Sequence, residues 1–143
     1  CGNPYGYEWT LSLVEDWCGK LIEDGVKVIS LSDTVGQASP ERFAEVYSAV
    51  TKVFPETTFG IHMHTRYDNW RDKVESAWNA GCRRFDGAVK GFGGCPFAED
   101  TLVGNLPTEK ILSFCTEKKI EHSVNIHRFQ SAYNQANEIF TEH

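Results

Sequence analysis

The sequence contains no apolar run of the ~18 residues that a membrane-spanning helix needs, and no signal peptide with a charged start and an apolar middle. It also has no run of like charges, and its formal charge of −6 argues against nucleic acid or an anionic membrane as the main partner. Neither a GxGxxG nor a GxxxxGKS/T nucleotide motif is present. We therefore expect a soluble, cytoplasmic protein that binds neither nucleic acid nor membrane.

The five cysteines show no CxxC spacing and are odd in number, which favours reduced thiols over a disulfide framework. Cys18 and Cys115 lie on apolar helix stripes and are expected in the core, and Cys82 lies at a helix-to-strand junction. Cys95 differs, because it follows Gly93 and Gly94 in a loop where a thiol could meet substrate. An inert cysteine and a functional one remain equally open there.

The chain begins at Cys1 rather than Met, so we expect it to be a piece of a longer protein.

Residues 1–143 have the length and the 41% hydrophobic content of one ordinary domain. Apolar residues recur at helical spacing in several segments, and short β-branched runs separate them. The patterns predict helices at 10–23, from Ser39 with Pro40 in the first turn, at 69–79, from 107 and at 126–142, and strands at 26–32, 59–65 and 83–89. The predicted buried stripes of the first two helices include Leu21 and Val53.

Strands that alternate with helices predict an α/β fold with a parallel sheet and right-handed crossovers. Only three strands are predicted, whereas a (β/α)8 barrel has eight in ~250 residues. The chain is therefore either a small open α/β domain or part of a barrel. A partial barrel exposes unpaired strand edges, so we expect a homo-oligomer or association with the missing portion.

Two histidines near the end of the second predicted strand are the first candidate site. His62 and His64 are two residues apart, so on a strand they face the same side. Two imidazoles placed in this way can hold a divalent metal ion, but structural histidines follow the same pattern about as often. The strand alone leaves both interpretations open.

Other polar residues follow the predicted strands at the same edge of the sheet, where parallel α/β proteins build their sites. Asp33 ends the first strand and is a candidate cap, partner of a ligand, or general acid or base. Asn105 lies in the segment Gly104 to Leu106 and is either a helix cap or an oxygen ligand for a hard divalent ion.

Four motifs together resemble the C-terminal half of the 3-hydroxy-3-methylglutaryl-CoA lyase family, and the resemblance spans nearly the whole chain. They are Ile29 to Gly36, His62-Met63-His64, Gly91 to Ala98 and Gly104 to Glu109. The resemblance implies that the three strands are the sixth, seventh and eighth of a (β/α)8 barrel. It implies that His62, His64 and Asn105 are ligands of Mg²⁺ or Mn²⁺, that Cys95 is a thiol that takes part in proton transfer, and that Asp33 is an active-site aspartate.

The reaction that this resemblance implies is retro-Claisen cleavage of an acyl-CoA substrate, 3-hydroxy-3-methylglutaryl-CoA, to acetyl-CoA and acetoacetate. The family's first strand, which supplies an arginine and an aspartate ligand, is absent, so we expect this chain alone to bind metal weakly and to be inactive. Two alternatives remain. One is a related Claisen-type synthase of the isopropylmalate or homocitrate kind, although Cys95 favours the lyase. The other is a noncatalytic α/β interaction module with structural histidines.

Overall fold

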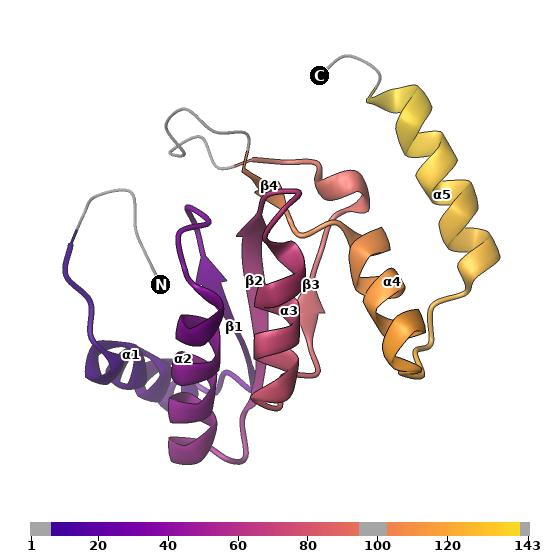
Figure 1. The fold of residues 1–143 in the computed structure, drawn as a ribbon. Coiled ribbons are helices and arrows are strands. Elements are labelled where there is room, and N and C mark those ends of the chain that lie inside the picture. The colour runs from indigo at the N-terminus through magenta and orange to yellow at the C-terminus, as the bar shows by residue number, and fades with distance from the viewer. Residues whose placement is uncertain (1–6, 95–102, 141–143) are drawn as a thin grey trace.

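The computed structural model describes residues 7–94 and 103–140. Its central feature is a parallel sheet in which β1 (Val28–Asp33) pairs with β2 (Thr58–Thr65), and β2 pairs with β3 (Phe85–Asp86) (Figure 1). The helices are α1 (Leu11–Glu23), α2 (Pro40–Val53), α3 (Trp70–Asn79), α4 (Thr108–Lys118) and α5 (Ile126–Ile139), with a short 3-10 turn η1 (Val89–Gly91). The predicted α/β fold with parallel strands is thus confirmed.

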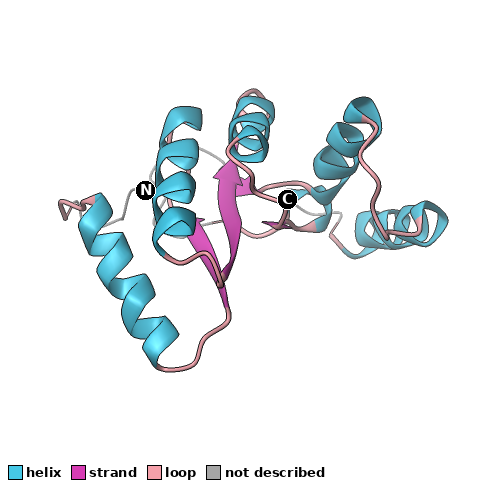
Figure 2. Cartoon of the chain, turned by 90° about the horizontal axis from the view of Figure 1, so that it is seen from below, coloured by secondary structure: helices cyan, strands magenta, loops and turns pink. Residues whose placement is uncertain are grey.

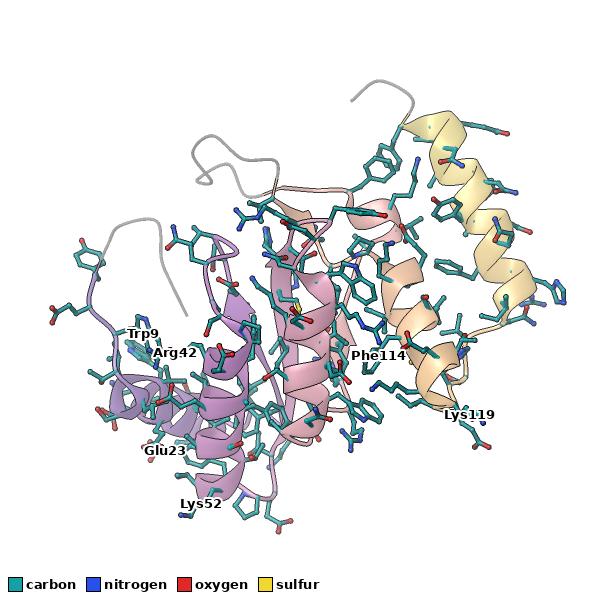
Figure 3. The ribbon with its side chains drawn as sticks, in the orientation of Figure 1. Trp9, Glu23, Arg42, Lys52, Phe114 and Lys119 are labelled. Carbon is teal, nitrogen blue, oxygen red and sulfur yellow. The ribbon has the colours of Figure 1, made fainter. Side chains whose placement is uncertain are left out.

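Local sequence chemistry accounts for where α2 begins. Ser39 is its N-cap, and the Ser39 hydroxyl accepts a hydrogen bond from the Arg42 backbone nitrogen at 3.3 Å. Pro40 occupies the first helical position, where its missing N–H costs no hydrogen bond. The guanidinium of Arg42 also lies over the Trp9 ring, 4.6 Å from its centroid, so the segment before α1 is held against α2 (Figure 3).

The core lies between the sheet and helices α2 and α3, which stand together against one face of the strands (Figure 2). Phe59, Ile61 and Met63 of β2 point into it and are almost fully buried. Because side chains alternate along a strand, His62 and His64 belong to the other face. The apolar half of β2 therefore fixes the direction of its histidines.

A fourth strand that the sequence analysis did not anticipate completes the site edge. Strand β4 (Gly104–Asn105) pairs antiparallel with the end of β2, with Asn105 opposite His64 and Gly104 opposite Thr65. A strand of two residues is too short to show an alternation of apolar and polar side chains, so no pattern in the sequence predicts it. Its pairing brings the segment after the glycine-rich loop back onto the histidine strand.

Several predicted boundaries and burials were wrong. The third strand was predicted over 83–89, but β3 contains only Phe85 and Asp86. Ala88 forms an isolated parallel bridge with Pro107, and the chain then turns into η1, where Lys90 adopts a φ of 58°. Val53 is 49% exposed although Val50, in the same last turn of α2, is fully buried, and Leu21 is exposed on α1. Helix α5 ends at Ile139 in the described part of the chain, whereas the prediction extended it to 142.

The cysteines of the described residues are free thiols. Cys18 and Cys82 are buried, whereas Cys115, which was expected in the core, is only partly buried. Burial raises the pKa of all three thiols, which keeps them protonated and poorly nucleophilic. None of these three cysteines therefore has the environment of a reactive thiol.

No helix within residues 7–94 and 103–140 is long and apolar enough to cross a bilayer.

Candidate metal site and the adjoining pocket

His62 and His64 lie together on the face of β2 that turns away from α2 and α3. Their ring centroids are 5.4 Å apart, with the ring planes tilted by 61°. Asn105 is the cross-strand neighbour of His64, and directly opposed residues of an antiparallel pair project to the same face. The structure thus brings the three predicted metal ligands to one edge of the sheet.

The Asn105 side chain is oriented by the glycine-rich loop. Its amide nitrogen donates to the carbonyl oxygens of Phe92 at 2.8 Å and Gly93 at 2.9 Å. Both N–H groups are therefore used by the loop, and the side-chain oxygen is the group left for a ligand. A carbonyl oxygen of this kind suits a hard divalent ion.

The His64 ring carries an unsatisfied polar atom. His64 is only 7% exposed, and its Nδ1 is buried without a hydrogen-bond partner. Burial lowers the pKa of this imidazole, and the nearby His62 lowers it further; of the weaker effects, Asp33 raises it and Lys73 lowers it. A neutral imidazole with an unpaired nitrogen is the form that binds a metal ion, so His64 fits a metal ligand.

The donor set of the described residues is limited to these three side chains. Residues 7–94 and 103–140 contain no group of three histidine, cysteine, aspartate or glutamate side chains that could hold a metal. Two imidazoles and one amide oxygen are neutral donors, which alone leave the charge of a divalent cation uncompensated. A tight site at this edge therefore requires further ligands.

Asp33 lies at the same edge but on the opposite face. It pairs in register with Met63, and its fully buried carboxylate accepts hydrogen bonds from the Gln37 and Ala38 backbone nitrogens, both at 3.1 Å. The ammonium of Lys73 on α3 lies 3.2 Å from the same carboxylate. Of the roles that the sequence left open for Asp33, this geometry corresponds to a cap of the loop after β1.

The predicted role of Cys95 falls on a residue that lies outside the described part of the chain. The glycines before it have a clear structural reason. Gly91 has a φ of 69°, and a Cβ built there would lie 2.7 Å from the Asn105 carbonyl oxygen. Glycine is therefore required where this loop crosses β4.

A cavity of about 420 Å³ adjoins Asn105, between the segment that follows β2 and the glycine-rich loop. Three cationic side chains line it, Arg66, Lys90 and Lys110, and among residues 7–94 and 103–140 no aspartate or glutamate lines it. The Lys110 ammonium lies 4.9 Å from the centroid of the Tyr67 ring, which also borders the cavity. In a chain with a net charge of −6, this pocket is a local cationic surface with an aromatic wall. The sequence analysis missed it because its cations come from three separate segments.

The parallel strands and the crossover helices define part of a (β/α)8 barrel, and the candidate site lies at the carboxyl ends of its strands. The chain belongs to the HMGL-like family, whose model matches residues 9–135.

Hydroxymethylglutaryl-CoA lyase YngG of Bacillus subtilis is 30% identical to it over 131 residues, which are 92% of this chain and 44% of that protein. The chain therefore spans less than half the length of this relative.

Solved structures show the same partial coverage. The Bacillus subtilis HMG-CoA lyase superposes with a TM-score of 0.88 at 29% identity, over 99% of this chain and 47% of that one. An HMG-CoA lyase from Acinetobacter baumannii, solved with coenzyme A and 3-methylmalate, superposes with a TM-score of 0.83 at 28% identity, over 96% of this chain and 45% of that one. The predicted partial barrel is thus confirmed.

Proposed function

We propose that this chain carries the metal-binding part of the active site of a carbon–carbon lyase that cleaves 3-hydroxy-3-methylglutaryl-CoA to acetyl-CoA and acetoacetate. The observation that carries the proposal is the convergence of His62, His64 and Asn105 at one strand edge, with a buried His64 nitrogen that has no partner. The family of the chain supports the reaction class.

In this proposal His62, His64 and the Asn105 side-chain oxygen hold Mg²⁺ or Mn²⁺. The metal, when bound, polarises the oxygens of the substrate and stabilises developing negative charge. The protein keeps His64 neutral by burial, and the loop carbonyls of Phe92 and Gly93 keep the Asn105 oxygen turned outward. His64 and Asn105 are thus prepared for the ion before it arrives.

The cationic pocket supports an acyl-CoA as the substrate, because coenzyme A carries phosphate groups and an aromatic base. Arg66, Lys90 and Lys110 supply positive charge beside Asn105, and Tyr67 supplies an exposed ring.

Cys95 follows the last glycine of the loop that borders this pocket. We assign its thiol the proton transfer, and we assign Asp33 the positioning of the loop after β1 rather than contact with substrate.

Turnover in this proposal requires strands that the chain lacks. The chain covers 44% of its Bacillus relative, and its donor set holds no anionic metal ligand among the described residues. We therefore expect the isolated chain to bind Mn²⁺ weakly and to produce no acetoacetate. Acetoacetate formation by the isolated chain would contradict this part of the proposal.

Metal binding is tested by titrating the chain with Mn²⁺ and following free Mn²⁺ by electron paramagnetic resonance. His62→Ala should abolish the binding, whereas His122→Ala, an exposed histidine on the segment between α4 and α5, should leave it unchanged. Equal affinity in the two variants would show that the strand histidines are structural, as in an interaction module.

The reaction is tested in a chimera in which residues 9–135 replace the corresponding part of the Bacillus subtilis HMG-CoA lyase. We expect cleavage of 3-hydroxy-3-methylglutaryl-CoA, a large loss of rate with Cys95→Ser, and retained Mn²⁺ binding in that variant. Near-normal turnover of Cys95→Ser would remove the thiol from the mechanism. Condensation activity with the substrates of isopropylmalate or homocitrate synthases would instead favour a Claisen-type synthase.

A further inference from the structure

Lys73 is a lysine buried in the protein interior, where charged side chains are rarely found. It lies on α3 with only 2% of its surface exposed, beside the apolar residues Val74 and Ala77 of the same helix. A lysine ammonium is strongly hydrated in water, so its burial is tolerated only where protein groups replace that water. The partners of this ammonium therefore indicate what the burial achieves.

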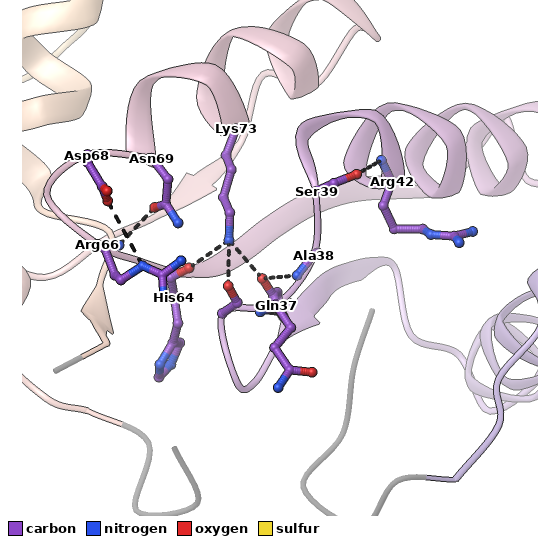
Figure 4. A network of polar contacts seen from close by, with 11 residues as sticks. Gln37, Ala38, Ser39, Arg42, His64, Arg66, Asp68, Asn69 and Lys73 are labelled. Atoms are coloured by element: carbon purple, nitrogen blue, oxygen red, sulfur yellow. Dashed lines mark hydrogen bonds and ion pairs between the residues drawn. The ribbon is translucent and has the colours of Figure 1, made fainter. Parts of the chain in front are cut away.

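Three oxygen atoms from two different strands and a loop surround the Lys73 ammonium. It donates to the Asp33 carboxylate at 3.2 Å, to the Gly36 carbonyl at 2.9 Å and to the His64 carbonyl at 3.3 Å (Figure 4). A lysine has three N–H donors, so these three contacts use all of them. Lys73 thus joins the end of β1, the loop that follows it and the end of β2 to helix α3.

The contact to His64 is made through the backbone, so it leaves the imidazole free. Figure 4 shows the His64 ring directed away from Lys73. The ring lies beside that of His62, with the centroids 5.4 Å apart. The ammonium therefore holds the strand at the residue that presents the ring, without competing for either ring nitrogen.

The loop after β1 packs against His64. Gly36 has a φ of 70°, and a Cβ built there would lie 3.5 Å from the His64 Cβ and 2.5 Å from a Val103 methyl carbon. Asp33 shapes this loop by accepting the Gln37 and Ala38 N–H groups. The loop after β1, the end of β2 and the segment before β4 are therefore packed together around the oxygen atoms that bind the Lys73 ammonium.

We propose that Lys73 is a positioning residue of the metal site, which fixes the end of β2 and thereby the direction of the His64 imidazole through the His64 carbonyl and the Asp33 loop. The inference rests on the proposed function in that it takes His64 as a ligand. Lys73 itself touches neither metal nor substrate in this arrangement.

The test compares Lys73→Met with Arg71→Met in the 143-residue chain. Both changes remove a cation from α3, but Arg71 lies at the surface and pairs with Glu117 on α4. We expect Lys73→Met to weaken Mn²⁺ binding by about 10- to 100-fold, the range found when groups that orient metal ligands are removed. Arg71→Met should leave Mn²⁺ affinity unchanged.

A second readout does not need the metal. Nuclear magnetic resonance of the histidine-labelled chain reports the environment of the His64 ring, and we expect its imidazole resonances to shift in Lys73→Met but not in Arg71→Met. If Lys73→Met fails to fold, Lys73→Gln, which keeps N–H donors without the charge, takes its place in both measurements.

The outcomes separate the inference from the proposed function. Unchanged Mn²⁺ affinity and unchanged His64 resonances, together with reduced thermal stability, would show that Lys73 is merely structural and would overturn the inference. If the unmodified chain fails to bind Mn²⁺, the proposed function is wrong, and the His64 resonances alone then decide whether Lys73 positions the ring.

Discussion

Single residues at the site edge have to meet two demands at once, and Asn105 shows this most clearly. Its nitrogen anchors the glycine-rich loop through two carbonyl oxygens, which leaves its oxygen available on the face that it shares with His64. Aspartate would supply the oxygen but not the N–H donors. The choice of an amide over a carboxylate is therefore explained by the loop.

Asn105→Asp should destabilise the chain by about 1–3 kcal/mol, because a carboxylate would then face two carbonyl oxygens that have lost their donors. Urea denaturation measures the change. Asn125→Asp is the matched control, since Asn125 caps α5 by accepting the Arg128 N–H at 3.0 Å, and aspartate caps a helix equally well. Equal stability of the two variants would contradict the anchoring role of the Asn105 nitrogen.

At the scale of elements, two ion pairs join helices α3 and α4 across the surface. The Arg71 guanidinium bonds both oxygens of Glu117, at 2.5 and 2.7 Å, and Lys118 pairs with Glu75. Hydrogen bonds from Arg71 lower the pKa of Glu117 below its ordinary value of 4.5. Because the folded-state pKa is the lower one, the stabilisation is present above pH 4.5 and is lost as the pH falls through the folded-state value.

Glu117→Gln should therefore be less stable than the unmodified chain near neutral pH, and the difference should shrink as the pH is lowered below 4.5. The difference should also decrease with added salt, because the pair is exposed. Thermal unfolding at several pH values measures both effects. A stability difference that stays constant through the acid range, or that matches the exposed control Glu56→Gln, would show that the pair contributes nothing.

The elements differ in how far their sequence predicts them. Helix α2 was predicted through its Ser39 cap and Pro40, and β2 through its apolar alternation, because these signals are local. Strand β3 was predicted too long, because beyond Asp86 the segment that contains β4 pairs with the end of β2, and Ala88 bridges Pro107 of that segment instead of β2. No local pattern indicates this change of partner. The Phe114 and Trp78 contact between α4 and α3, with ring centroids 6.2 Å apart, likewise depends on tertiary packing.

The site was predicted in the same uneven way. The spacing of His62 and His64 placed both rings on one face. The residues left Asn105 open as a helix cap or an oxygen ligand, and the family resemblance favoured the ligand. Lys73 was missed because a lysine in a helix is ordinarily read as exposed. A signal was present, since Lys73 lies four residues before the buried Ala77 and so falls on the apolar stripe of α3. Nothing local, however, indicates its partners in β1 and β2.

At the scale of the whole molecule, the sheet is open at both ends. Strand β1 pairs only with β2, and β3 pairs only with β2, so within the described residues each has a free edge. Val28 at the start of β1 is 48% exposed. Open edges with apolar residues favour pairing with another chain.

We therefore expect the isolated chain to associate in a concentration-dependent manner, with a mass in solution above the 16.1 kDa of one chain. Analytical ultracentrifugation measures this association. Val28→Lys should weaken it, because an edge lysine opposes strand pairing, whereas Val124→Lys, an exposed residue remote from β1, should not. A monomer at all concentrations would show that the free edges do not pair.

The pairing of β4 with β2 has a consequence for folding. His64 and Asn105 are distant in the sequence, and a loop, helix α3 and strand β3 lie between them. An ion held by both side chains would bridge the two ends of this long segment, which meet only once the sheet has formed and the entropy of closing the loop has been lost. The metal would then bind the native state alone and stabilise it by RT ln(1 + c/Kd), where c is the concentration of free Mn²⁺, so the unfolding temperature would keep rising with the logarithm of the free ion concentration above Kd. In this way the site would help to hold together the sheet edge on which it is built.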